Sequence, residues 1–274
     1  KRHNLATKQV ISEDGKMNEA AGPLVKGKTT KEAREIVVQL LHQEGLIEGE
    51  EKTMQNLATA ERSGGVVEPM PMLQWFIDVT KEFEREGKMV TIQSLTQDAV
   101  RSGRIKIIPE RFEKGYFQWV DHLRDWCISR QLWYGHRVPA WYRGEEVFVG
   151  TQAPEADGWQ QDPDTLDTWF SAGMWTFTTL GWPDETSDLK QYHPTSVLET
   201  GYDILTFWVV RMVMMTTYLM NEVPFKAVYL HGLVRDEFGR KMSKSLDNII
   251  NPLDMISQYG ADATRLSLVI GATP

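Results

Sequence analysis

The 274-residue sequence contains very little cysteine, and its charge balance is acidic. The single cysteine, Cys127, excludes an intrachain disulfide and a zinc centre built from several cysteines, so we expect a cytoplasmic protein. A net charge of −8 argues against attraction of nucleic acid by the whole surface, although a local basic patch would still allow RNA contacts.

Several common functional motifs are also missing. Neither Gly-x-x-x-x-Gly-Lys-Ser/Thr nor Gly-x-Gly-x-x-Gly occurs, which excludes the two commonest phosphate-binding loops. Ser63 lies in Arg-Ser-Gly-Gly, so a serine hydrolase of the Gly-x-Ser-x-Gly type has no support. The histidines lack the spacing of metal ligands, and we expect no protein-bound metal.

The chain offers little evidence for a membrane segment. Its amino end lacks both an initiator methionine and a signal peptide, so we expect a segment of a longer protein. The apolar run 204–220 is marginal in length for a membrane span and carries Arg211 near its middle. We therefore expect a buried helix of a soluble α/β domain and no membrane partner.

Glycine and proline punctuation divides the chain into residues 1–68 and 69–274. In the first region, apolar spacing predicts a helix over 29–45. In the second, strands at 196–199 and 225–231 flank a helix at 203–220, which predicts a right-handed crossover between parallel strands. Further strands are expected at 73–79 and 104–108, further helices at 91–101 and 110–123, and a hairpin with a loop at about 138–166.

The string Lys-Met-Ser-Lys-Ser at 241–245 is the strongest chemical signal. A bare Lys-x-x-Lys pair is more often a solvated basic loop. Here the string lies in a polar loop at 235–251, called the lysine loop below, which follows an apolar strand ending in His231-Gly232. Lysine ammonium groups in such a loop suit the binding of a polyphosphate.

A second strand end carries Gly201 and Asp203. Glycine permits close approach of the backbone to a ligand, whereas Asp203 taken alone is more often a helix N-cap than a ligand-binding residue. Ligands of open α/β sheets bind at the carboxyl ends of strands, so the two strand ends and the lysine loop together favour a nucleotide site. Among many core tryptophans, Trp169 and Trp208 are candidates for walls of a small apolar pocket.

The lysine string resembles the ATP-binding signature of class I aminoacyl-tRNA synthetases. Longer runs resemble the valyl-tRNA synthetase family over essentially the whole chain; they lie at residues 2–5, 13–18, 74–76, 126–136, 138–142, 167–171, 199–205 and 224–262. The resemblance implies an α/β fold, the carboxyl-terminal half of a Rossmann-like nucleotide-binding domain with a parallel sheet and flanking helices at 69–274. Residues 1–68 would be the end of a mixed α+β editing domain.

The resemblance also implies an activity. Valine and ATP, with Mg²⁺ in the substrate complex, would form valyl-adenylate, and the valyl group would pass to tRNA(Val). The complete enzyme would be a monomer that also hydrolyses threonyl-tRNA. The implied roles are catalysis by Lys241 and Lys244, ATP or adenosine binding by Gly201, His231, Gly232, Met242, Ser243 and Ser245, and valine binding by Trp169, Asp203, Ile204 and Trp208.

The chain departs from the family pattern in what it omits. It lacks the His-x-Gly-His signature and the acidic editing motif, ends before an anticodon-binding domain, and has no cysteine in the loop 144–165. We therefore expect half an active site that neither aminoacylates nor edits by itself. An isoleucine enzyme and a non-catalytic module that binds nucleotide or RNA are the alternatives.

Overall fold

The computed structural model describes residues 3, 5–60, 64–244 and 247–271. The chain divides into two compact units, Lys1–Leu73 and Gln74–Pro274. This division falls slightly beyond the predicted boundary at residue 68. The identification of the first region as the end of an editing domain stays a prediction.

The first unit contains the predicted helix as α1 (Thr30–Gln43), after a short 3₁₀ turn η1 (Glu19–Ala21). Thr29 and Glu32 form a reciprocal capping box, in which each side chain accepts a hydrogen bond from the other residue's backbone N–H. Gly45 follows the helix with φ of 67°, a conformation that glycine adopts without steric cost. Capping signals and helical periodicity are both local, which explains why the sequence predicted this element.

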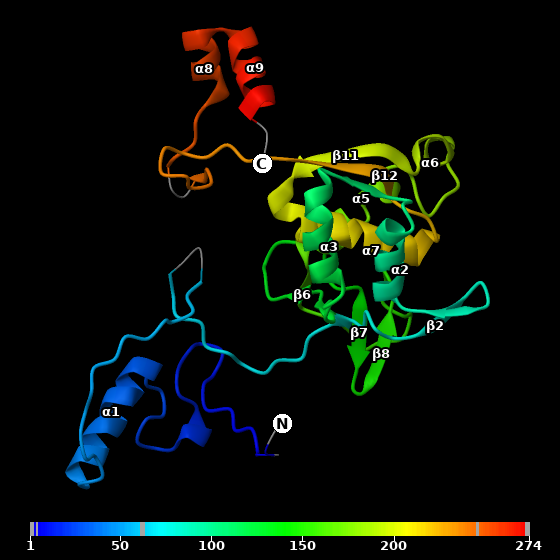
Figure 1. Cartoon of the computed structure of the whole chain (residues 1–274). Coiled ribbons are helices and arrows are strands. Elements are labelled where there is room, and N and C mark those ends of the chain that lie inside the picture. The colour runs from blue at the N-terminus through cyan, green and yellow to red at the C-terminus, as the bar shows by residue number, and fades with distance from the viewer. Residues whose placement is uncertain (1–2, 4, 61–63, 245–246, 272–274) are drawn as a thin grey trace. The chain divides into compact units, whose positions relative to one another are not determined.

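The second unit is built on a three-stranded parallel sheet with the order β11–β12–β4. Its strands are β4 (Lys106–Ile108), β11 (Thr195–Gly201) and β12 (Phe225–His231). The predicted parallel pairing of the last two strands is confirmed, and β11 and β12 lie side by side (Figure 1). Their final residues, Gly201 and His231, are register partners.

Helix α7 (Val210–Met220) packs against α2 (Ile92–Arg101) and contributes five of its eleven residues to the hydrophobic core of this unit. Val210, Met212 and Val213 are fully buried. The segment Tyr202–Met220 is long and apolar enough for a membrane span by composition, but half of that window is buried inside the protein. This burial is typical of a core helix.

The prediction of a single regular helix over 203–220 is wrong for its first half, 203–209. The chain forms a 3₁₀ turn η3 (Tyr202–Ile204), a π-helical turn η4 (Leu205–Val209) and only then α7. Ile204 has φ of −107° and ψ of 16°, which interrupts the regular helical path. Apolar periodicity detects the helical segment but cannot report a change in its winding.

A predicted hairpin is confirmed as β7 (Ala140–Arg143) and β8 (Glu146–Val149), with Gly144 at φ of 61° in the turn. The expected strand 73–79 is reduced to β1 (Phe76–Ile77), and the expected helix 110–123 is split into η2 (Glu110–Phe112) and α3 (Glu113–Val120). The remaining elements are β2 (Phe83–Arg85), β3 (Lys88–Val90), β5 (Trp126–Cys127), β6 (Ser129–Arg130), β9 (Gln160–Gln161), β10 (Thr165–Leu166), α4 (Thr168–Gly173), α5 (Trp175–Thr178), α6 (Ser187–Tyr192), α8 (Pro252–Tyr259) and α9 (Ala261–Gly271).

Candidate functional site

The adjacent carboxyl ends of β11 and β12 bring several predicted site residues together. His231 lies beside Gly201 at the end of the parallel pair. Its Nδ1 is 2.6 Å from the Gly232 carbonyl oxygen, and its Nε2 is 3.2 Å from Oε1 of Glu199. The imidazole is thus held in a fixed orientation at the edge of the sheet where ligands of α/β folds bind.

Position 201 requires glycine because a side chain would not fit there, and not because of its backbone conformation. Its φ of −62° suits any residue. A Cβ atom added there would lie 2.7 Å from Oδ1 of Asp203 and 3.0 Å from Cδ2 of Leu233. The missing side chain therefore lets the Asp203 carboxylate fold back against the end of β11.

Asp203 does not cap a helix, so the capping alternative is wrong. The position before η3 belongs to Gly201, without a side-chain capping bond. The Asp203 carboxylate instead accepts a hydrogen bond from the Lys241 ammonium, with 2.5 Å between Oδ2 and Nζ. The lysine loop thus reaches the strand-end carboxylate, as the predicted convergence requires.

The lysine loop begins with a tight turn organised by Asp236. Its carboxylate accepts hydrogen bonds from the backbone N–H groups of Phe238 and Arg240 and from Nε of Arg240. Gly239 occupies the left-handed region with φ of 74°. The hydrogen bond from the Asn248 amide, together with those from Arg240, lowers the pKa of Asp236 to about 2.

The base of this loop is tied to the β11 end of the site. Arg235 pairs with Lys241 in an antiparallel bridge and donates a hydrogen bond from Nη2 to the Tyr202 hydroxyl at 2.8 Å. The Tyr202 ring in turn stacks on Phe112, with 5.7 Å between ring centroids. These contacts fix where the loop leaves the sheet.

The rest of the predicted loop residues are only partly placed. The Met242 sulfur accepts a hydrogen bond from the Ile250 N–H, and the Lys244 carbonyl oxygen accepts one from the Asp247 N–H. Ser245 lies outside the described residues. Among the described residues, no hydrogen bond or ion pair joins the Lys244 ammonium to another predicted site residue.

A cavity of about 890 Å³ lies at this edge of the sheet. It is large enough for a nucleotide, since small-molecule sites span roughly 300–1,000 Å³. Its walls come from the ends of β11 and β12, the lysine loop and α9: Glu199, Tyr229, His231, Gly232, Leu233, Val234, Arg235, Lys241, Met242, Ser267, Leu268 and Val269.

The predicted valine-pocket residues lie on α4 and on the irregular turns before α7. Trp169 stacks on Phe207 with 6.0 Å between ring centroids, and Trp208 donates a hydrogen bond from its indole to the Ala172 carbonyl oxygen. Both tryptophans pack against the core, and Ile204 is half-buried. Elements α4 and η4 are in contact, so the structure brings this group close together. Their role in binding valine stays a prediction.

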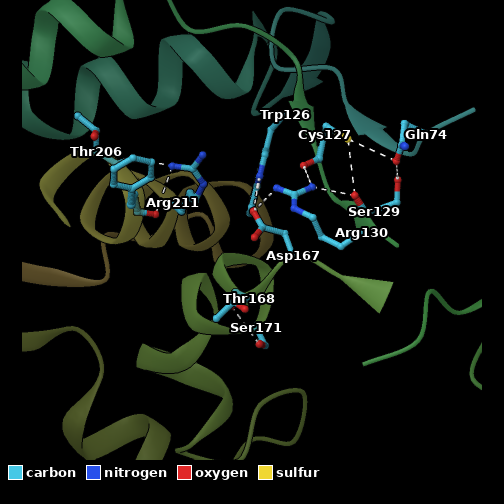
Figure 2. Close-up of polar contacts among 11 residues, drawn as sticks. Gln74, Trp126, Cys127, Ser129, Arg130, Asp167, Thr168, Ser171, Thr206 and Arg211 are labelled. Carbon is cyan, nitrogen blue, oxygen red and sulfur yellow. Dashed lines mark hydrogen bonds and ion pairs between the residues drawn. The ribbon is translucent and has the colours of Figure 1, made fainter. Parts of the chain in front are cut away.

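A buried polar cluster anchors the start of α4 (Figure 2). Oδ2 of Asp167 accepts a hydrogen bond from the Trp126 indole at 3.0 Å and forms an ion pair with Nη2 of Arg130 at 3.1 Å. The Arg211 guanidinium lies 4.8 Å from the Trp126 ring centroid, and burial lowers the pKa of Arg211. This cluster was not predicted from the sequence, although Arg211 within an apolar segment was a signal for it.

Among the residues that the structure describes, no group of three or more His, Cys, Asp or Glu side chains is placed to hold a metal ion. The cations available at the candidate site are lysine and arginine side chains. They suit contacts to phosphate oxygens rather than coordination chemistry.

The fold and the strand-end site define a class. The family model "tRNA synthetases class I (I, L, M and V)" matches residues 24–155 and 148–274, and the chain belongs to this family. The predicted fold class is therefore confirmed. The apo structure of methionyl-tRNA synthetase from Mycobacterium tuberculosis, with a TM-score of 0.50 and 18% identity, covers 77% of this chain and 35% of that chain and supports the fold alone.

Within this class, the chain is similar in sequence to valine–tRNA ligases. The chain is 47% identical over 277 residues to the valine–tRNA ligase of Oceanobacillus iheyensis, covering 100% of this chain and 30% of that protein. It is 48% identical over 280 residues to the valine–tRNA ligase of Dehalococcoides mccartyi, covering 100% of this chain and 31% of that protein. The chain thus spans less than a third of these relatives.

Proposed function

We propose that the complete protein containing this chain is a cytoplasmic valine–tRNA ligase. It would join valine to ATP as valyl-adenylate, transfer the valyl group to tRNA(Val) and hydrolyse mischarged threonyl-tRNA. The proposal rests on one combined observation. A lysine loop lies at the strand ends of an α/β sheet, in a chain 47% identical along its whole length to a valine–tRNA ligase.

The proposed chemistry is positioning and charge neutralisation. Valine attacks the α-phosphorus of ATP, and pyrophosphate leaves with added negative charge. Lys241 and Lys244 would neutralise that charge, with Mg²⁺ arriving on ATP. Met242, Ser243 and Ser245 would complete the phosphate side, and Gly201, His231 and Gly232 the adenosine side.

The amino acid would bind beside the nucleotide. Asp203 would accept hydrogen bonds from the valine ammonium, and Trp169, Ile204 and Trp208 would enclose its side chain. Lys241 holds Asp203 in the structure, so substrate binding requires this ion pair to exchange partners. An apolar pocket excludes larger side chains but discriminates weakly against isosteric threonine, which is why editing belongs to the proposal.

This chain would supply one half of the synthetic site. It contains no His-x-Gly-His string. We therefore expect no aminoacylation or editing by the 274 residues alone, and restored activity in the complete protein, which we propose to be a monomer.

Valine-dependent exchange of pyrophosphate into ATP tests the proposal in the complete protein. Exchange with valine should greatly exceed exchange with isoleucine, and equal rates would favour an isoleucine enzyme. ATP binding without exchange for any amino acid would favour a non-catalytic nucleotide-binding module.

Lys244→Ala tests the proposed catalytic role. Loss of a charged contact made mainly in the transition state should lower the rate of adenylate formation by roughly 10²–10³-fold, with little change in valine binding. Lys190→Ala is the control, because Lys190 lies in the exposed helix α6 and pairs with Glu185. Equal losses in rate and in valine binding would contradict the role.

A further inference from the structure

A side chain beyond the lysine string closes the lysine loop on itself. The Asn248 amide oxygen accepts a hydrogen bond from the Ser243 N–H at 2.8 Å. Its amide nitrogen donates to Oδ2 of Asp236 at 2.9 Å and approaches the Lys241 carbonyl oxygen at 3.3 Å. One side chain thus connects the first turn of the loop to the backbone on both sides of Met242.

Asp236 is the fixed end of this connection. Its side chain is only 10% exposed, although the surrounding loop lies at the surface. Besides Asn248, it binds the N–H groups of Phe238 at 3.0 Å and Arg240 at 2.8 Å and the Arg240 guanidinium at 2.7 Å. Because these bonds hold the carboxylate at the turn, it can anchor the Asn248 amide.

The anchored backbone carries cations whose side chains are largely exposed. The Lys241 side chain is 61% exposed, and Lys244 is exposed as well. A long lysine side chain on a mobile loop loses backbone and side-chain entropy when it binds phosphate. A loop whose backbone is already fixed loses less, so more of the contact energy remains for the transition state.

We propose that Asn248, held by Asp236, is a positioning residue that sets the lysine loop for phosphate neutralisation. This inference rests on the proposed function, because it assigns the loop a part in adenylate formation. Both functions of the amide are needed at once: its oxygen accepts from one side of the loop, and its nitrogen donates to the other. An aspartate at 248 would lose the donor and set a second carboxylate against Asp236.

The test uses the complete protein and valine-dependent pyrophosphate exchange. Asn248→Ala should lower kcat about tenfold or more while the KM for valine stays within about twofold, because the valine pocket lies on other elements. Asn251→Ala is the matched control, since its side chain accepts from the Leu253 N–H at the start of α8. That variant should keep the wild-type kcat.

A paired substitution distinguishes positioning from a general structural role. Asn248→Asp should lower kcat at least as much as Asn248→Ala. Arg240 Nε donates to the same Asp236 oxygen as Asn248, so the exchange is made in an Arg240→Ala background. There, adding Asp236→Asn restores a donor opposite the new carboxylate, and the double variant should recover at least about fivefold over Asn248→Asp. A double variant no faster than the single one would overturn the pairing.

The inference and the proposed function fail in different ways. If the wild-type protein shows no valine-dependent exchange, the proposed function fails. If the wild-type protein exchanges and Asn248→Ala has the same kcat, or raises the KM for valine as much as it lowers kcat, the positioning role alone fails. Equal melting temperatures of wild type and variants establish that the comparison is made on folded protein.

Discussion

At the scale of single residues, Gly201 shows how a missing side chain shapes the site. An added Cβ would lie 2.7 Å from Oδ1 of Asp203, closer than real contacts allow. Gly201→Ala should therefore displace the carboxylate and raise the KM for valine about tenfold or more in the complete protein. Steady-state pyrophosphate exchange at varied valine concentration measures this effect.

Gly115→Ala provides the control for that substitution. Gly115 lies within α3, and an added Cβ meets nothing within 4 Å. Alanine in a helix interior is favoured over glycine by about 0.5–1 kcal/mol, so this variant should be slightly more stable and unchanged in KM. An equal rise in KM for both variants would contradict the steric explanation.

We predict that His193 makes the stability of the second unit depend on pH. Burial lowers its pKa, and the charge of Glu222 offsets part of the effect. The folded protein therefore binds this proton less readily than the unfolded chain, whose histidine pKa is about 6.5. Stability is fully present above that value and falls as the pH drops below it.

Urea unfolding of the chain at pH 5.5 and 7.5 measures this dependence. His193→Gln should reduce the difference in unfolding free energy between the two pH values. The exposed His122→Gln is the matched control and should leave the difference as it is in the wild type. The same pH dependence in wild type and His193→Gln would exclude this histidine as its source.

At the scale of elements, the N-terminus of α2 is stabilised by its own cap. The Thr91 hydroxyl accepts a hydrogen bond from the Ser94 N–H, and the Ser94 hydroxyl oxygen accepts one from the Thr91 N–H. Because α2 packs on α7, its loss affects the core of the unit. Thr91→Ala should lower the unfolding free energy by about 1 kcal/mol, measured by chemical denaturation.

The exposed Thr151 is the control for this prediction. It lies in the loop after β8, outside any helix. Thr151→Ala should leave the unfolding free energy within about 0.5 kcal/mol of the wild type. A cost at Thr91 no larger than at Thr151 would show that the cap does not stabilise α2.

Elements with strong local signals could be predicted from the sequence. Strand β12 has the predicted bounds, because buried Val228 and Leu230 alternate with exposed Tyr229 and a buried Phe225 begins the run. Helix α1 is recognisable from its capping residues and periodicity. The 3₁₀ and π turns at 202–209 could not be predicted, because their winding follows from packing around the site rather than from local preference.

At the scale of the whole molecule, an irregular segment inside the first unit predicts where a protease cuts. The segment around Lys52 has no helix or strand and exposes apolar side chains such as Met54. Arg211 lies in the core helix of the second unit. Brief trypsin treatment should cleave after Lys52 before Arg211, and mass spectrometry of the fragments identifies the order.

Early cleavage after Arg211 would contradict this order of cleavage. It would mean that α7 is accessible to the protease and that the core of the second unit opens readily. Protection of both sites would instead show that the segment around Lys52 is less accessible than its exposed side chains indicate.

The sequence alone determined the residue types and the spacing of the site. The lysine string, the strand-end glycine and aspartate, and the tryptophans are readable because motifs and periodicity are local properties. Their order along the chain also implied that two parallel strand ends and a loop meet at one edge.

Only the tertiary structure decided which side chains touch. It joined Lys241 to Asp203, placed Asn248 between Ser243 and Asp236, and buried Asp167 against Trp126. These contacts link residues far apart in sequence or on opposite sides of a loop. Each hydrogen bond requires its donor–acceptor distance to be correct to within a few tenths of an ångström. The packing of the chain sets these distances, and no local sequence pattern encodes them.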